Sequence, residues 1–170
     1  MLRLLAVLPV RSSELAAMQW SQIDWESAQW KYTVGKTQRA FVMPLPHQAV
    51  KLLEGLKAQA NGSEWVFPSG LKRGGHVHPN FVRLTLVEKL GYEVGKVTCH
   101  GFRSTHRTLG QEALDIDPVI LELNLGHLMP GVMGETYARA KMLPQRTEAM
   151  QKWADYLDEL RMKATAQGGE

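Results

Sequence analysis

Two pairs of polar residues, each spaced three positions apart, stand where helices are expected to begin. In Arg11-Ser-Ser-Glu14, an arginine beside a helix N-terminus is followed by a carboxylate that can orient its guanidinium, which makes an anion-binding corner. In His100-Gly-Phe-Arg103, positions i and i+3 share one helical face, so both side chains could hydrogen-bond phosphate oxygens. Taken alone, a capped helix with a surface ion pair explains the first pair, and the second is a weak pattern.

Three further features are also ordinary when each is read by itself. Lys36 lies in a Gly-containing loop together with Arg39, and hairpin tips commonly carry lysine for solubility. Gly126-His127 precedes Tyr137 by ten residues, where the histidine could be a C-cap and the tyrosine a packing residue. A phenol has a pKa near 10, so a nucleophilic tyrosine would need help from neighbouring groups at neutral pH.

Taken in chain order, the five features are the Arg11 pair, Lys36, the His100 pair, His127 and Tyr137. In this order they resemble one family, the tyrosine recombinases, and are most similar to the catalytic domain of prophage integrases of the satellite-phage type. The similarity runs from about Leu4 to Leu157. It includes the connecting segments VRSSELAAMQWSQID, FVMPLPHQA, WVFPS, HGFRST and MQKWADYLD.

The resemblance implies a mechanism for cleaving and rejoining DNA without a metal, a nucleotide or any other cofactor. Arg11 and Arg103 would clamp the non-bridging oxygens of the scissile phosphate. Tyr137 would attack in line, leaving a 3′-phosphotyrosyl link and a free 5′ hydroxyl.

The remaining roles are implied in the same way. His100 would assist proton transfer at the nucleophile, Lys36 would protonate the leaving 5′ oxygen, and His127 would hydrogen-bond the phosphate. Glu14 would support Arg11. The expected further DNA contacts are Arg39, Lys72, Arg73 and Arg139.

Metal-dependent chemistry fits the sequence poorly. Asp115 and Asp117 stand near a helix start, where capping explains them, so they do not form the carboxylate cluster of a two-metal nuclease. His76, His78 and Cys99 could be drawn as a zinc site, but a fourth ligand and a recognisable spacing are missing.

The elements that must position these residues are mainly helical. Strands are expected at 29–34 and 40–43, joined by a loop as a hairpin, because aromatic and β-branched residues flank Gly35. Ser12 or Ser13 is expected to cap a helix over 13–20. Further helices are expected at 2–8, 47–60, 80–90, 102–113, 117–125, 135–140 and 144–163.

The predicted fold class is therefore mainly α with a small antiparallel β-hairpin or sheet (α+β), a tyrosine recombinase catalytic-domain fold that is truncated at its N-terminus. Residues 1–164 would form this single domain and 165–170 a flexible tail. An apolar helix at residue 1 is unusual, so we expect the chain to begin inside a larger protein and this helix to pack imperfectly.

Composition leaves the function open but excludes some classes. The chain of 170 residues has a net charge of +3, which permits DNA binding without requiring it. Its single cysteine suits a reducing cytoplasm, where we expect the protein to act. Neither a membrane span nor a signal peptide is recognisable.

The sequence leaves three functions open. The first is site-specific recombination, with a double-stranded DNA attachment site as partner. The second is nicking and religation like that of a type IB topoisomerase, and the third is a non-catalytic DNA-binding remnant. The apolar positions 150, 153, 157 and 160 of the last helix would pack within the chain or dock on a further protomer on DNA.

Overall fold

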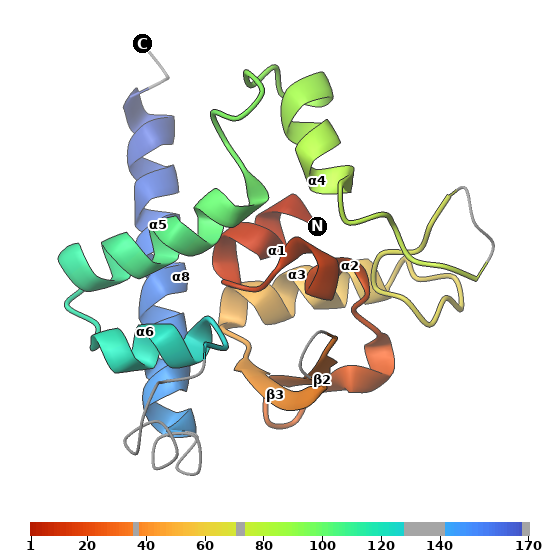
Figure 1. The fold of residues 1–170 in the computed structure, drawn as a ribbon, viewed down its shortest axis with the longest axis horizontal. Coiled ribbons are helices and arrows are strands. Elements are labelled where there is room, and N and C mark those ends of the chain that lie inside the picture. Colours follow the sequence, from red (N-terminus) through yellow and green to blue (C-terminus); the bar gives the residue numbers. More distant parts are fainter. Residues whose placement is uncertain (36–37, 71–73, 128–141, 168–170) are drawn as a thin grey trace.

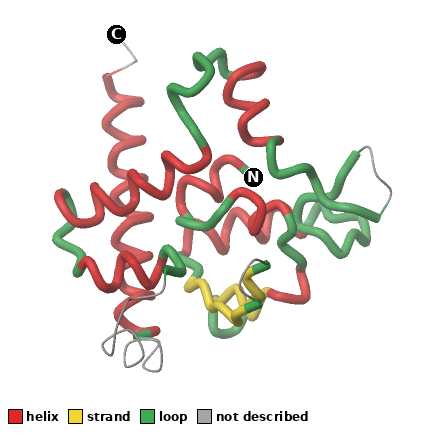
Figure 2. Tube along the Cα trace, viewed as in Figure 1, coloured by secondary structure: helices red, strands yellow, loops and turns green. Residues whose placement is uncertain are grey.

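The computed structural model describes residues 1–35, 38–70, 74–127 and 142–167 (Figure 1). It is largely helical, with a small antiparallel sheet at the bottom of the view in Figure 2. The expected mainly α fold with a small antiparallel sheet is therefore confirmed. The helix expected at 135–140 lies outside the described residues.

The sheet consists of three antiparallel strands in the order β1-β2-β3: β1 (Ile23–Asp24), β2 (Gln29–Val34) and β3 (Arg39–Pro44). Strands β2 and β3 confirm the expected hairpin, whereas β1 was not expected. In the register of the hairpin, Tyr32 lies opposite Phe41. Trp30 and Val34 on β2 are buried, so one face of the sheet covers the core.

The first two helices are α1 (Leu2–Val7) and α2 (Ser12–Ala16), followed by a 3₁₀ turn, Trp20–Gln22. The expected cap of the second helix was wrong, because Arg11 rather than Ser12 or Ser13 is the N-cap residue. The helix also ends earlier than expected. Past the end of this helix, the backbone N–H of Val66 donates to the carbonyl of Met18 at 2.9 Å. This bond belongs to a short antiparallel bridge in which Gln19 pairs with Trp65.

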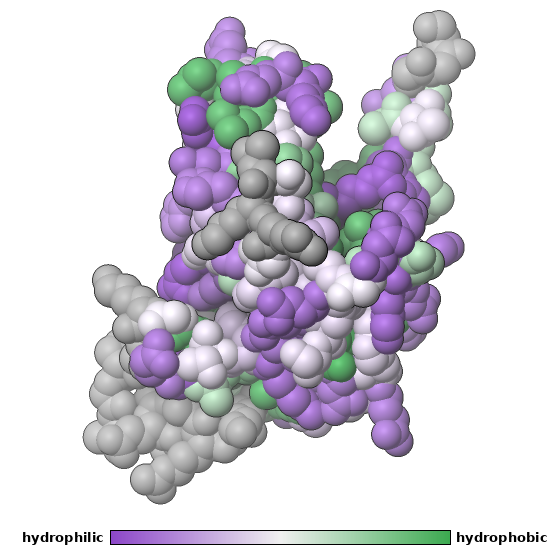
Figure 3. Space-filling view, turned by 90° about the vertical axis from the view of Figure 1, so that its right-hand side faces the viewer, coloured by the Kyte–Doolittle hydropathy of each residue, from purple (hydrophilic) through white to green (hydrophobic). Residues whose placement is uncertain are grey.

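The middle of the chain contains α3 (His47–Lys57) and α4 (Phe81–Leu84), which continues as a π-helical turn, Thr85–Lys89. The expected helix at 80–90 is thus present but irregular. Exposed apolar side chains gather in and after it, and Figure 3 shows a hydrophobic cluster at the top left on an otherwise largely hydrophilic face. Its exposed large apolar residues are Phe81, Leu84, Leu90, Tyr92 and Val94.

The C-terminal half contains α5 (Cys99–Glu112), α6 (Pro118–Asn124) and α8 (Leu143–Gln167). Figure 1 shows α5 and α6 beside each other, with α6 packed against the long α8. Asp117 caps α6 by accepting a hydrogen bond from the N–H of Val119, as expected for this aspartate. Helix α8 extends beyond residue 163, so residues 165–167 of the expected tail are helical.

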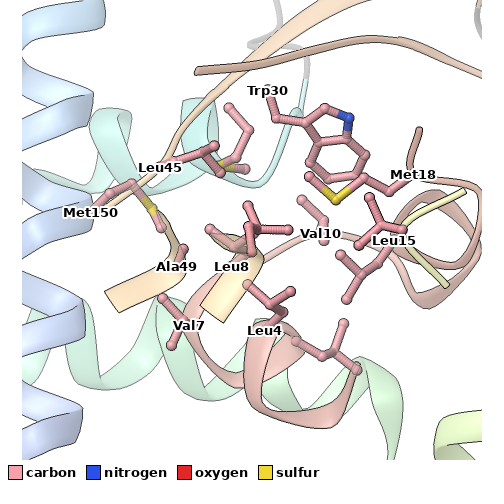
Figure 4. Close-up of a cluster of buried hydrophobic side chains, with 14 of the residues drawn as sticks. Leu4, Val7, Leu8, Val10, Leu15, Met18, Trp30, Leu45, Ala49 and Met150 are labelled. Carbon is pink, nitrogen blue, oxygen red and sulfur yellow. The ribbon is translucent and has the colours of Figure 1, made fainter. Parts of the chain in front are cut away.

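The core joins the N-terminal helix to the sheet and to α8 (Figure 4). Leu4, Leu5 and Leu8 are at most 1% exposed, so the expectation that the first helix packs imperfectly was wrong. Leu8 lies near Ala49 and Leu45, and Met150 of α8 reaches the same cluster. The segment Pro9–Arg11, which leads to the predicted anion-binding corner, therefore emerges from a closely packed interior.

One surface feature lies away from the predicted chemistry. A groove between α1, α3, α4 and α8 is lined by Leu2, Leu56 and Leu157, and no described residue of the predicted site lines it. Among the helices of the described ranges, none combines the length and the apolar composition that crossing a bilayer requires.

Candidate active site

The N-terminus of α2 holds the first predicted pair. The backbone N–H of Arg11 donates to Oε2 of Glu14 at 3.0 Å, and Nη1 of Arg11 donates to Oε1 at 2.8 Å. The side chain of Arg11 is 47% exposed while that of Glu14 is 9% exposed. Glu14 therefore anchors the arginine from within the protein and leaves part of the guanidinium open to an anion from solvent.

Tyr32 on β2 completes this corner from the sheet side. Its hydroxyl donates to Oε2 of Glu14 at 3.2 Å, and its ring stacks on Trp30 with centroids 4.1 Å apart. Burial, followed by the neighbouring Glu14 carboxylate, raises the pKa of the Tyr32 phenol. The phenol is thus kept protonated, and it acts as a hydrogen-bond donor to Glu14.

Arg103 lies in the first half of α5 and is 5% exposed. Its Nη1 donates to the carbonyl of Pro9 at 2.5 Å and its Nη2 to the carbonyl of Leu125 at 2.9 Å. One side chain therefore connects the segment before α2 with the end of α6. These two acceptors are neutral, so the positive charge of the guanidinium is not cancelled by them.

The two predicted arginines act on each other electrostatically. Burial, and then repulsion from Arg11, lower the pKa of the Arg103 guanidinium, while Glu14 and Glu122 act in the opposite direction. Two cations brought close enough to repel one another create a site that favours a bound anion.

His127 follows the turn that ends α6 and is within reach of Arg103. Nη2 of Arg103 lies 3.1 Å from Nε2 of the imidazole, and Nδ1 of the imidazole lies 2.6 Å from Oε2 of Glu122. Oε1 of the same carboxylate accepts a hydrogen bond from Nε of Arg107 at 2.5 Å. The imidazole is thus held between an acidic residue on α6 and the buried arginine on α5.

The hairpin supports the loop that carries His127. Nη2 of Arg39 on β3 donates to the carbonyl of Gly126 at 2.8 Å. Gly126 has φ +70°, and a Cβ built on it would lie 3.3 Å from the Phe41 ring, so both the backbone conformation and the close approach favour glycine. In the described structure Arg39 binds protein backbone, and its expected contact with DNA stays a prediction.

His100 lies in the first turn of α5, which Thr98 caps by accepting a hydrogen bond from Gly101 N–H at 3.0 Å. Its side chain is exposed, three positions before Arg103. The structure therefore pairs Arg11 with Glu14 and, separately, Arg103 with His127. The charges of Arg11 and Glu14 act on Arg103, which joins the two pairs into one electrostatic network. Five other predicted residues lie outside the described ranges: Lys36, Lys72, Arg73, Tyr137 and Arg139.

Two members of this network were not predicted from the sequence. The inward position of Tyr32 could have been predicted, because side chains alternate along a strand and Tyr32 therefore lies on the opposite face from Lys31 and Thr33. The contact of Glu122 with His127 could also have been predicted, because a glycine that ends a helix commonly brings the next residue back over the last turn.

The arrangement can hold a phosphate-like anion between guanidinium groups and an imidazole. These groups can also stabilise negative charge that develops on such an anion during a displacement. In the described ranges, no group of three or more His, Cys, Asp or Glu side chains is placed to hold a metal ion, and His76, His78 and Cys99 are not gathered.

The sequence profile described as the phage integrase family matches residues 1–142. Prophage integrase IntZ of Escherichia coli (strain K12) is 33% identical over 161 residues, which is 94% of this chain and 39% of that protein. The integrase of Shigella phage Sf6 is 32% identical over 160 residues, or 92% of this chain and 41% of that one. The chain thus spans about two fifths of the length of these relatives.

A solved structure shares the fold. The integrase from mycobacterium phage Brujita superposes with a TM-score of 0.65 at 20% sequence identity, covering 88% of this chain and 49% of that one.

Proposed function

Because the chain belongs to the phage integrase family, we propose that it carries the catalytic centre of a site-specific recombinase that integrates or excises phage DNA. The observation that carries this proposal is the position of Arg103. It is buried, it is held by the carbonyls of Pro9 and Leu125, and its guanidinium meets His127 while repelling Arg11. Such a cluster suits a phosphodiester in a trigonal-bipyramidal transition state.

The proposed reaction has two steps that conserve the phosphodiester bond energy. The phenolic oxygen of Tyr137 attacks phosphorus in line, the bond from phosphorus to the 5′ oxygen breaks, and a 3′-phosphotyrosyl link forms. His100 takes up the phenolic proton and Lys36 supplies a proton to the leaving 5′ oxygen. A 5′ hydroxyl of a second strand then attacks the link and releases Tyr137.

In this proposal the other named residues bind rather than transfer protons. Arg11 and Arg103 hold the non-bridging oxygens, His127 hydrogen-bonds one of them, and Glu14 holds Arg11. Double-stranded DNA containing an attachment site is the partner, contacted further by Arg39, Lys72, Arg73 and Arg139. Additional protomers would join on the DNA through α8, and the reaction would take place in the cytoplasm of a bacterial cell.

A pool of nicked duplexes of random sequence tests the chemistry without a known attachment site. Cleavage near the nick releases a short fragment whose 5′ hydroxyl diffuses away, so the covalent adduct accumulates. We expect adducts that resist boiling in detergent with the unaltered protein and with Tyr92→Phe, an exposed control, but none with Tyr137→Phe. Adduct formation by Tyr137→Phe would contradict the proposal.

The duplex sequences recovered from the adducts then allow recombination to be distinguished from simple nicking and religation. Two duplexes that carry the selected sequence and differ in length should yield exchanged products. Adducts and religation without exchanged products would favour the topoisomerase-like function instead.

A further inference from the structure

The end of α6 has a backbone geometry that brings two side chains together. The N–H of Gly126 donates to the carbonyl of Leu123 at 3.1 Å, and the N–H of His127 donates to the carbonyl of Glu122 at 3.0 Å. With φ +70° at Gly126, this pair of bonds is the Schellman arrangement, in which the chain turns back over the last helical turn. His127 is thereby placed over Glu122.

This contact determines which nitrogen of His127 carries a proton. An ionised carboxylate only accepts hydrogen bonds, so the 2.6 Å contact of Oε2 of Glu122 with Nδ1 requires a proton on Nδ1. In the neutral ring Nε2 is then an acceptor. This agrees with its other contact, since Nη2 of Arg103 can only donate and lies 3.1 Å away.

Glu122 is itself held in the ionised form. Burial acts to raise the pKa of its carboxyl, but hydrogen bonds from Arg107 and His127 outweigh it and the pKa is lowered. The Arg107 bond occupies Oε1 and leaves Oε2 to the imidazole, so each oxygen has a separate partner. The carboxylate is therefore fixed in position as well as in charge.

We propose that Glu122 is a positioning residue for His127, which fixes the imidazole in the Nδ1–H tautomer with Nε2 directed at Arg103. Arg107 supports it by holding the other carboxylate oxygen. The role in catalysis rests on the proposed function: a proton taken up on Nε2 would let the ring donate to a phosphate oxygen while Nδ1–H stays on Glu122. Glu122 would stabilise the cation so formed.

Nitrogen NMR of the histidine rings in the free protein tests the tautomer without any DNA. At alkaline pH, long-range proton–nitrogen correlations distinguish a protonated ring nitrogen from a bare one. The signals of His127 are identified by their loss in His127→Gln. We expect Nδ1 protonated and Nε2 bare, and a wild-type ring with the proton on Nε2 would overturn the proposal.

Variants then test whether Glu122 is the cause. Glu122→Ala should give mixed tautomers of His127, and adduct formation should be slower by roughly 10- to 100-fold. This is the range seen when the hydrogen-bond partner that orients a metal-binding histidine is removed. The matched control is Glu112→Ala, an exposed carboxylate near the end of α5, which should change neither. Glu122→Ala with an unchanged tautomer and an unchanged rate would contradict the role.

The two proposals fail in distinguishable ways. If no protein variant, including the unaltered chain, forms adducts, the proposed function fails while the tautomer measurement still decides the role of Glu122. If adducts form but the tautomer does not depend on Glu122, only the positioning role is lost. If Glu122→Ala does not fold, a wild-type ring with the proton on Nε2 would still overturn the proposal.

Discussion

Nη2 of Arg103 lies 3.1 Å from Nε2 of His127, although 24 positions separate the two residues in the sequence. The contact exists because α5 and α6 pack against each other and the glycine turn after α6 directs His127 back toward α5. The guanidinium reaches further, to the carbonyl of Pro9 before α2. Three separate segments of the chain thus meet at one buried cation.

Replacing Arg103 by lysine should abolish most of the activity. A lysine ammonium cannot occupy the positions of Nη1 and Nη2 together, so the Pro9 or Leu125 carbonyl would lose its donor and the bidentate hold on a phosphate would be lost. We expect adduct formation to fall by about 100-fold or more and the free energy of unfolding by about 1–3 kcal/mol. The exposed Arg83→Lys is the matched control. Wild-type adduct yields from Arg103→Lys would contradict this role.

The parts of this site that the sequence predicted are those with local patterns. The i, i+3 spacing of Arg11 with Glu14, and of His100 with Arg103, follows from helix geometry, and the aromatic alternation of 29–34 follows from strand geometry. The contact of Tyr32 with Glu14 depends on how β2 packs near α2, which no short-range pattern encodes.

Short and irregular elements account for most of the differences in the fold. A two-residue strand such as Ile23–Asp24 has no periodicity to detect. Ser12 has the side chain that is preferred at an N-cap, yet the helical backbone begins after Arg11. The carboxylate of Glu14 accepts the hydrogen bond from the backbone N–H of Arg11. At 85–89 the helix widens into a π-turn, which apolar spacing does not foretell.

Acid should destabilise the protein through His106. This residue is fully buried on α5, its ring lies edge-on to Trp153 at 5.0 Å, and neither ring nitrogen has a partner among the described residues. Burial, followed by the charge of Arg103, lowers its pKa to about 4. Between about pH 6.5, the ordinary pKa of histidine, and about pH 4, the pKa in the folded protein, His106 is therefore protonated in the unfolded chain but neutral in the folded one.

The stability that depends on a neutral His106 is fully present above about pH 6.5 and is lost as the pH falls to about 4. The loss should be roughly 3 kcal/mol, since one pKa unit corresponds to about 1.4 kcal/mol. Urea unfolding across this range checks it. His106→Leu should flatten the pH dependence, whereas the exposed control His47→Gln should keep it. If the free energy of unfolding of His106→Leu fell as steeply with decreasing pH as that of the unaltered protein, other groups would be responsible for the effect.

Gly110 should not tolerate a side chain, because α5 and α6 approach each other there. A Cβ on Gly110 would lie 2.6 Å from Cδ2 of Leu121, a fully buried residue. We expect Gly110→Ala to lower the free energy of unfolding by about 1–3 kcal/mol. The matched helical control is Gly55→Ala, which meets nothing within 4 Å and should raise stability by up to about 1 kcal/mol. Thermal melts that rank the two variants the other way would contradict this packing.

Arg146 should be needed for docking α8 on the rest of the domain. It is 4% exposed, its Nε donates to Asn124 Oδ1 at 2.9 Å, and its Nη2 donates to the Val42 carbonyl at 2.7 Å. Arg146→Met would leave the buried Asn124 oxygen and the part-buried Val42 carbonyl without this donor, and the buried oxygen alone should cost about 1–3 kcal/mol. Arg161→Met, at an exposed position of the same helix, should change the denaturant midpoint little. Equal midpoints for the two variants would contradict this anchoring role.

The most direct test of the proposed chemistry is to locate the covalent link to DNA. The sequence has four tyrosines, at positions 32, 92, 137 and 156, so the site of attachment is a choice among few candidates. Adducts from the nicked duplex pool are digested with nuclease and trypsin, and mass spectrometry then finds the peptide that retains a nucleotide. We predict a 3′-phosphotyrosyl link on Tyr137. A link on Tyr92, Tyr156 or any other residue would contradict the proposal.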